Sequence, residues 1–219
     1  MKNVIISWSS GKDSTLTLER LLEDNNYNVV GLFTTYVDDT VPFQATPLTV
    51  VQAQADAIGL PLIRIPLPEI FPANDLYQST IVGALKNSGL AIDAVAFGDM
   101  YCNGIADYRR SYIEPQGWEC TLPLLGADTS ALAKEVIQRG IETRLMTVDS
   151  SQLDSSFCGA VYDSKLIEAL PKGVDPCGED GEFHTLVTNA PCFRKSINVE
   201  MTVQENDGRF FYQRYKYIA

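Results

Sequence analysis

Apolar and polar residues alternate along the first half of the chain with two different periods. Short apolar runs bounded by turn residues are typical of buried β-strands, and the segments between them carry apolar residues at the spacing of amphipathic helices. The pattern predicts strands at 4–7, 29–34, 62–65 and 93–97, and helices at 14–23, 46–58 and 74–86, with Asn74 as the cap of the last helix. Strands that alternate with helices in this way predict an α/β fold with a doubly wound parallel sheet.

The pattern changes after Gly126. It then predicts helices at 129–139 and 164–170, a strand at 142–148, and a β-hairpin of strands 197–203 and 210–217 that turns at Asn206-Asp207-Gly208. We therefore expect two units, residues 1–126 with the parallel sheet and a smaller C-terminal α+β domain of residues 127–219.

The segment Ser9-Ser10-Gly11-Lys12-Asp13-Ser14 joins the first predicted strand to the first predicted helix. A helix N-terminus presents unpaired backbone N–H groups and a positive partial charge, and glycine lets an anion approach the main chain. With a lysine and several hydroxyls added, the segment is suited to a polyphosphate. It is not a Walker A loop, because Ile6 and Asp13 stand where that loop needs glycine and Ser or Thr. The simpler interpretation, a serine-capped helix after a buried strand, is also open for this segment alone.

A second group of reactive side chains lies in the turn-rich segment 173–185. Glycines and a proline at its turns predict an irregular loop that presents acids rather than core residues. Its spacing fits neither a Cys-x-x-Cys metal site nor an EF-hand. Each residue also has an ordinary interpretation, since the cysteine and histidine can be structural and the acids can be solvated. The residues concerned are Cys177, Glu179, Asp180, Glu182 and the only histidine of the chain, His184.

Together, the two motifs resemble the diphthine ammonia ligase family of PP-loop ATP pyrophosphatases, in the adenine nucleotide alpha hydrolase superfamily. The segments 96–100, 122–126 and 190–193 resemble further parts of that family in the same order. The resemblance implies a ligase that cleaves ATP between its alpha and beta phosphates. A substrate carboxylate is adenylated, pyrophosphate is released, and ammonia displaces AMP to form an amide. The family acceptor is diphthine on a translation elongation factor.

For ATP, the resemblance implies an ATP-binding domain in residues 1–126, with Ser9 to Ser14 on the beta and gamma phosphates. Lys12 is expected to neutralise charge on pyrophosphate, and Asp13 and Asp99 are expected to bind Mg²⁺. Gly98 and Asp99 follow a predicted strand, so they should lie at the same sheet edge as the phosphate loop. Asp99 as a simple turn cap is the competing interpretation. Arg109 and Arg110 follow on a predicted helix, one suited to clamping an anion and the other to a surface pair.

For the acceptor, the resemblance implies a binding site in residues 127–219. Glu179 or Glu182 is expected to bind ammonium and take its surplus proton, and His184 is the reserve base. Cys177 is expected to be structural, because adenylation followed by ammonia attack needs no covalent enzyme intermediate. A trimethylammonium group on the acceptor would favour an acidic or aromatic site.

The composition of the chain limits the kinds of partner and the cellular compartment that we expect for it. Its 17 Lys and Arg residues against 28 Asp and Glu residues give a net charge of −11, which argues against general nucleic-acid binding. The five cysteines lack paired spacing, as expected for reduced thiols in the cytoplasm. No segment has the length of a membrane span, so we expect a soluble cytoplasmic protein. Whether the chain forms a homo-oligomer is left open.

Two other functional classes stay open. A sulfur-transfer or tRNA-modifying pyrophosphatase would depend on a catalytic cysteine, and a nucleotide-binding sensor would tolerate substitution of the acids in 173–185. The chain also departs from the family pattern at two positions. Ser10 replaces a loop glycine, and Asp180 adds a charge that could indicate an acceptor other than diphthine.

Overall fold

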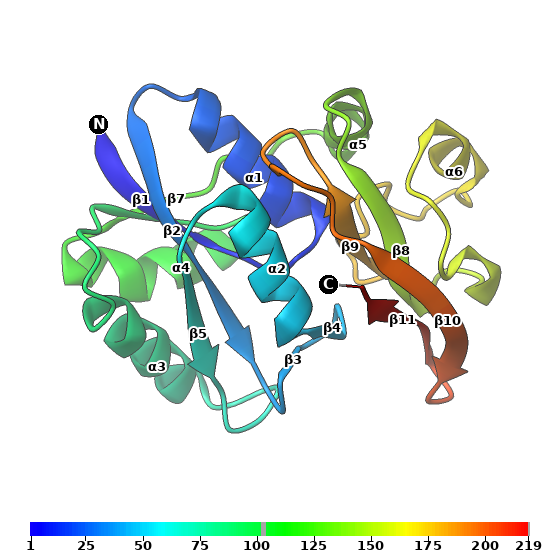
Figure 1. The fold of residues 1–219 in the computed structure, drawn as a ribbon, viewed down its shortest axis with the longest axis horizontal. Coiled ribbons are helices and arrows are strands. Elements are labelled where there is room, and N and C mark those ends of the chain that lie inside the picture. The colour runs from blue at the N-terminus through cyan, green and yellow to red at the C-terminus, as the bar shows by residue number, and fades with distance from the viewer. Residues whose placement is uncertain (102–103, 219) are drawn as a thin grey trace.

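The computed structural model describes residues 1–101 and 104–218 and contains two main β-sheets with helices around them (Figure 1). The first is a five-stranded sheet in the order β5-β2-β1-β6-β7, and all its neighbouring strands run parallel. Its strands are β1 (Lys2–Ser7), β2 (Tyr27–Tyr36), β5 (Leu62–Pro66), β6 (Ala94–Ala96) and β7 (Glu119–Thr121). The predicted doubly wound α/β fold is confirmed.

Helices cover both faces of the parallel sheet. They are α1 (Lys12–Glu23), α2 (Leu48–Ile58), α3 (Asn74–Lys86) and α4 (Ile105–Ile113), which continues into the short 3₁₀ helix η1 (Glu114–Gln116). The residues of β1 alternate between the two faces, as the pleat of a strand requires. Val4 and Ile6 pack in a cluster with α1 and α2, whereas Ile5 packs in a second cluster with α3 and α4.

The second sheet is antiparallel, in the order β10-β11-β8-β9. Its strands are β8 (Glu142–Asp149), β9 (Phe183–Asn189), β10 (Val199–Asn206) and β11 (Phe210–Tyr217). Around it lie α5 (Thr129–Gln138), the 3₁₀ helix η2 (Ser155–Phe157) and α6 (Ser164–Ala169). A short hairpin of β3 (Thr40–Val41) and β4 (Thr46–Pro47) projects from the first sheet toward this region (Figure 1).

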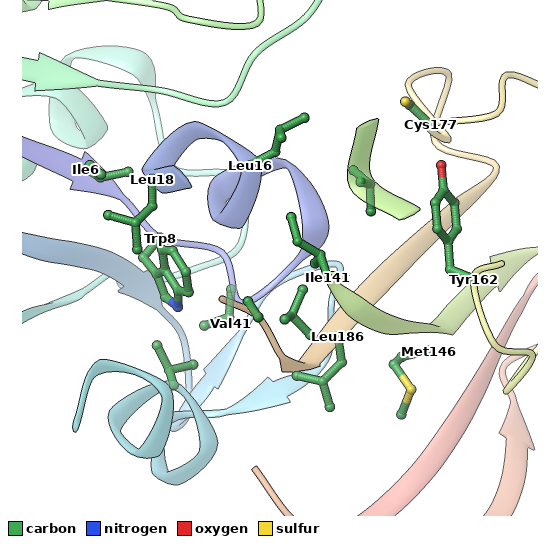
Figure 2. Close-up of a cluster of buried hydrophobic side chains, with 14 of the residues drawn as sticks. Ile6, Trp8, Leu16, Leu18, Val41, Ile141, Met146, Tyr162, Cys177 and Leu186 are labelled. Carbon is green, nitrogen blue, oxygen red and sulfur yellow. The ribbon is translucent and has the colours of Figure 1, made fainter. Parts of the chain in front are cut away.

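One hydrophobic cluster runs from the first sheet to the second. Figure 2 shows Ile6 of β1 and Leu16 and Leu18 of α1 at one end, and Met146 of β8 and Leu186 of β9 toward the other. Tyr162 and Cys177 continue the cluster beyond the second sheet (Figure 2). The two sheets thus share a core, and the expected division of the chain at residue 126 stays a prediction.

The sequence pattern predicted most elements within a few residues, and α3 within one residue of its observed start. Asn74 as its cap was wrong, because the cap position is Ala73 and Asn74 is the first helical residue. The segment 173–185 was also misjudged, since β9 begins at Phe183 and both Cys177 and Glu182 are buried. Thr46 and Pro47, predicted as helical, form β4 instead.

Candidate active site

The loop between β1 and α1 has an unusual backbone at Ser10. Its φ angle is 74°, in the left-handed region that glycine occupies at little cost and other residues seldom adopt. The Ser10 hydroxyl donates to Oγ1 of Thr46 at 2.8 Å, and the side chain is completely buried. The backbone at position 10 therefore has a conformation typical of glycine. The serine side chain is held by its hydrogen bond to the β3–β4 hairpin.

Strand β9 holds the same loop from the other side. The backbone N–H of Lys12 donates to Oγ1 of Thr185 at 3.1 Å, and the N–H of Val187 donates to the Ser10 carbonyl at 3.0 Å. A Cβ atom on Gly11 would lie 3.1 Å from the Thr185 carbonyl oxygen, so a larger residue there would crowd strand β9. Gln54 of α2 donates to the carbonyls of Ser10 and Val187 and bridges the two segments.

A cavity of about 210 Å³ lies beyond the ends of β1 and β6. In the strand order, β1 pairs with β2 on one side and with β6 on the other, which makes this the point where the sheet reverses its winding. Open α/β sheets bind their ligands at such a point. The cavity brings together residues predicted to bind nucleotide or metal with residues of other segments. Its lining residues are Ser7, Ser9, Asp13, Ser14, Phe97, Gly98, Asp99, Arg109 and Glu179.

Gly98 permits the close approach of β6 to the start of α1. A Cβ atom at this position would lie 3.1 Å from the Asp13 carbonyl oxygen and 3.2 Å from the Thr17 hydroxyl. Within the chain that the structure describes, the backbone N–H groups of Asp13 and Ser14 have no protein acceptor. The first turn of α1 thus presents free donors beside the cavity.

Lys12 is buried, with a side chain only 2% exposed. Its ammonium group lies 2.8 and 3.0 Å from the two carboxylate oxygens of Asp13, and also donates to the Cys177 carbonyl. It lies 5.7 Å from the centre of the Phe183 ring. Burial lowers the pKa of Lys12, but Asp13, Cys177 and Glu179 together raise it by more, so the ammonium stays charged.

Asp99 pairs with Arg109 across the cavity wall. Nε of Arg109 donates to one carboxylate oxygen at 2.9 Å, and a terminal nitrogen lies 3.4 Å from the other. The guanidinium also lies 4.4 Å from the centre of the Phe97 ring. Burial lowers the pKa of Arg109, but Asp99 and the neighbouring Tyr112 and Tyr77 together raise it by more. Among the described residues, Arg110 forms exposed ion pairs with Asp107 and Glu114, at 3.7 and 3.8 Å, so Arg110 is the surface pair. Arg109 holds the Asp99 carboxylate instead.

Glu179 is the acid of segment 173–185 that lines the cavity. Burial, and then repulsion from Asp13, raises its pKa from 4.5 to about 7. A carboxyl group with this pKa exchanges a proton readily at neutral pH.

Glu182 has a different environment. Its carboxylate accepts hydrogen bonds from the backbone N–H groups of Asp175 at 2.8 Å and Asp180 at 3.0 Å, and the residue is 2% exposed. These hydrogen bonds hold the turns of the segment 173–185 around the buried Glu182 side chain. Cys177 is buried beside it, donates to the Thr129 carbonyl, and has a pKa raised by burial to about 12. Asp180 is exposed.

His184 points into a second, larger cavity of about 670 Å³. Burial and the charge of Lys12 lower its pKa to about 4, so the ring is neutral at pH 7. The predicted bases are therefore separated: Glu179 lines the first cavity, His184 lines the second, and Glu182 lies buried in the segment between them.

The described residues contain no group of three or more His, Cys, Asp or Glu side chains arranged to hold a metal ion on their own. Asp13, Asp99 and the Ser9 and Ser14 hydroxyls nevertheless line one cavity and supply oxygen donors. This donor set fits Mg²⁺ in its usual form, where one or two carboxylates bind the ion and phosphate oxygens complete its shell. Among residues 1–101 and 104–218, no helix has the length and apolar character needed to cross a membrane. Cys120, Cys158, Cys177 and Cys192 are free thiols, and Cys102 lies outside the described residues.

A parallel α/β sheet with a phosphate-type loop after its first strand and a polar cavity at its switch point defines a nucleotide-binding class of protein. Residues 1–120 match the diphthamide synthase N-terminal domain, and residues 128–218 match the diphthamide synthase C-terminal domain. The chain belongs to the diphthamide synthase family.

Two relatives are similar over much of the chain. Diphthine--ammonia ligase of Danio rerio is 29% identical over 189 residues, which cover 76% of this chain and 69% of the relative. Diphthine--ammonia ligase of Schizosaccharomyces pombe is 24% identical over 237 residues, which cover 95% of this chain but only 38% of the relative.

Among solved structures, a predicted subunit of tRNA methyltransferase from Methanocaldococcus jannaschii is 17% identical with a TM-score of 0.45, over 66% of this chain and 79% of that one. The U34-tRNA thiolase NcsA from Methanococcus maripaludis is 16% identical with a TM-score of 0.38, over 63% and 56% of the two chains.

Proposed function

We propose that this protein is an ATP-dependent, amide-forming ligase of the diphthine ammonia ligase type. It would adenylate a substrate carboxylate, release pyrophosphate, and transfer ammonia to the acyl adenylate with loss of AMP. The single observation that carries the proposal is that Glu179, with a pKa of about 7, shares one cavity with the phosphate-type loop and with Asp13 and Asp99. Family membership and the named activity of the two relatives support it.

In this proposal, the phosphates of ATP lie on the segment 9–14. The free N–H groups of Asp13 and Ser14 and the Ser9 and Ser14 hydroxyls would donate to phosphate oxygens. Lys12 would bring a fixed positive charge close to the pyrophosphate, because the Asp13 carboxylate and the Cys177 carbonyl hold its ammonium in place.

Magnesium would be held by Asp13 and Asp99 together with phosphate oxygens. When bound, the ion supplies charge neutralisation for the departing pyrophosphate. Asp99 already accepts from Arg109, so the guanidinium would remain its partner and orient the carboxylate toward the cavity. Gly98 would keep this wall close enough to the start of α1 for both carboxylates to face the same phosphates.

Glu179 is the proposed base for ammonia. Ammonium has no free electron pair, so it must lose a proton before its nitrogen can attack the acyl adenylate. Asp13, Asp99 and Glu179 make the cavity attractive to a small cation, and the pKa of Glu179 is suited to accepting that proton near neutral pH. Glu182 is less suited, because backbone N–H groups occupy both of its oxygens. His184 remains a reserve base from the neighbouring cavity.

The acceptor would bind mainly to residues 127–219, with diphthine on an elongation factor as the acceptor that the relatives' names imply. A cysteine-dependent sulfur-transfer enzyme is the less favoured alternative, because burial raises the pKa of Cys177 to about 12 and leaves its thiol protonated. A nucleotide-binding sensor is also less favoured, since ATP binding alone gives no reason for a carboxyl group with a pKa of about 7 beside the loop.

The proposal is tested by the products formed from ATP. The purified chain is incubated with MgATP, ammonium and diphthine-bearing elongation factor, and AMP with pyrophosphate is separated from ADP with phosphate. We expect AMP that depends on both ammonium and the acceptor. Formation of ADP instead would exclude cleavage at the alpha phosphate, and AMP formation independent of ammonium would exclude the amide-forming step.

A further inference from the structure

The second cavity differs from the first in size and in chemistry. It has a volume of about 670 Å³, and apolar and aromatic side chains form most of its wall. They come from both halves of the chain: Val41, Phe43, Ile70 and Phe71 from one, and His184, Phe210 and Tyr212 from the other. Such a cavity has the size and lining of a site for an organic ligand, whereas the first cavity is lined mainly by polar side chains.

Phe43 is held at this cavity at a cost in backbone energy. Its φ angle is 67°, in the left-handed region that a bulky residue seldom adopts, although its side chain is 51% exposed. Its carbonyl accepts from the Thr147 hydroxyl at 3.0 Å, and its ring centre lies 5.5 Å from that of Phe71 and 5.9 Å from that of His184. Strain of this kind at an exposed aromatic residue indicates a functional constraint, because folding alone gains little from it.

Both cavities border the phosphate-type loop and the elements that support it. The charge of Lys12 acts on the pKa of Glu179, which lines the first cavity, and on that of His184, which lines the second. The hydrogen bond from Ser10 to Thr46 ties the phosphate-type loop to the hairpin that carries Val41 and Phe43. The hairpin that lines the second cavity is thus in contact with the loop whose residues line the first.

The charged side chains at the wall are already paired. Arg209 bonds to the buried Asp149 at 2.5 Å, and Arg214 bonds to Glu205 at 2.8 Å. Asp207 accepts from the backbone N–H groups of Arg209 and Phe210 within its own turn. His184 is neutral at pH 7. The surface offered to a ligand is therefore aromatic and apolar rather than ionic.

We propose that the second cavity binds the acceptor through an uncharged, ring-containing or apolar part of that molecule. Phe43 and Phe71 would complete the contact surface that His184, Phe210 and Tyr212 provide from residues 127–219. The acceptor carboxylate then extends past the segment 173–185 to the first cavity. This inference rests on the proposed ligase function, which requires a second substrate beside ATP.

The first experiment compares Phe43→Gly and Phe71→Ala with Val203→Ala, which removes an exposed apolar side chain outside both cavities. We expect the KM for diphthine-bearing elongation factor to rise at least tenfold in the two cavity variants. The Kd for ATP, measured by calorimetry, should stay within twofold of the wild type. Glycine relieves the strain at position 43, so Phe43→Gly should also keep or raise the melting temperature, which a merely structural phenylalanine would not allow. Unchanged KM values would overturn the proposal, and so would a weakened Kd for ATP at constant KM, since the cavity would then hold the nucleotide.

The second experiment does not depend on ligase activity. Binding of indole to the full chain is followed by saturation-transfer NMR, with the same three variants. We expect indole binding that weakens at least fivefold in Phe43→Gly and Phe71→Ala and not in Val203→Ala. Equal indole binding by all proteins would overturn the assignment of the cavity. If the wild type forms no AMP, the proposed function fails, and the indole result still decides whether the cavity binds ring-containing ligands.

Discussion

Lys12 and Asp13 are neighbours in the sequence and partners in space, with the Lys12 ammonium 2.8 and 3.0 Å from the two Asp13 carboxylate oxygens. Consecutive residues of a helix do not normally face each other, so the long lysine side chain must fold back to make this contact. The buried Lys12 charge limits the rise in the pKa of Glu179, which lines the first cavity, and helps to lower the pKa of His184, which lines the second.

We expect Lys12→Met to raise the pKa of His184 above about 4 and that of Glu179 above about 7, because the charge that lowers both is removed. ATP turnover should fall by about 100-fold or more, the usual cost of losing a fixed charge at a reacting phosphate. His184 is the only histidine, so its proton NMR signal is unambiguous in a tag-free chain. Lys134→Met, at an exposed position, is the matched control. A His184 titration that does not move would contradict the proposed position of the charge.

The pKa of Glu179 predicts how the attack of ammonia on the acyl adenylate depends on pH. The group acts as a base only when deprotonated, so the ammonium-dependent rate should rise with pH through about 7 and level off above it. In Glu179→Gln the rise of the rate with pH should disappear, and the rate should fall by about 100-fold or more. Asp180→Asn, which changes the exposed neighbouring acid, should keep the rise. If the rate of Glu179→Gln still rises with pH through about 7, another group is the base.

The raised pKa of Glu179 also predicts that the stability of the fold falls as pH rises, whereas the ammonium-dependent rate increases. Folding raises the pKa of Glu179 above its ordinary value of 4.5, so the folded chain holds this proton more tightly than the unfolded chain. The resulting stability is fully present below about pH 4.5 and is lost as pH rises through about 7. We therefore expect Glu179→Gln to be more stable than the wild type at pH 8, by about 1–3 kcal/mol. Urea unfolding at pH 8 and at pH 4.5 measures this, and a difference that is equal at both pH values would contradict it.

Glu182 is expected to act through the shape of its segment. In Glu182→Gln, only the amide oxygen can accept, so one of the two backbone N–H groups of Asp175 and Asp180 loses its partner. We expect a loss of about 2–3 kcal/mol in the free energy of unfolding and faster protease cleavage within 173–183. The exposed Glu168→Gln serves as the control. A Glu182→Gln protein of unchanged stability that still loses ammonium-dependent turnover would instead assign Glu182 to the chemistry.

Two substitutions separate the strain at Ser10 from its hydrogen bond. Ser10→Ala loses the bond to Thr46 but keeps the left-handed backbone, whereas Ser10→Gly loses the bond and relieves the strain. The free energy of unfolding of Ser10→Gly should therefore be about 1 kcal/mol higher than that of Ser10→Ala. Chemical denaturation of both variants tests this order. An alanine variant as stable as the glycine variant would show that the backbone there is not strained.

The periodic part of the fold was readable from the sequence because each helix and strand carries its own apolar pattern. The helix 74–86 and the hairpin that ends in 210–217 are examples. Short elements without room for a pattern were not predicted, such as β7 (Glu119–Thr121) and the β3–β4 hairpin. Strand β9 was hidden because turn residues dominate the segment that leads into it.

Local sequence also could not separate the two glutamates of the segment 173–185. Glu179 and Glu182 have similar neighbours in the chain, yet one lines a cavity and the other is buried against backbone N–H groups. Their difference arises from how the turns fold back on themselves. Arg109 was similarly ambiguous beside Arg110, because its pairing depends on Asp99, ten residues earlier in the loop after β6.

The phosphate-type loop lies at the beginning of the chain, but its supports lie near the end. The backbone N–H of Lys12 donates to the side-chain hydroxyl of Thr185, and the Ser10 carbonyl accepts from the N–H of Val187. A ribosome that has translated only the parallel sheet has therefore made a loop without its supporting strand. During synthesis, the nucleotide site is completed only after β9 emerges, so a nascent or prematurely terminated chain lacks the shaped loop on which the adenylation step would depend.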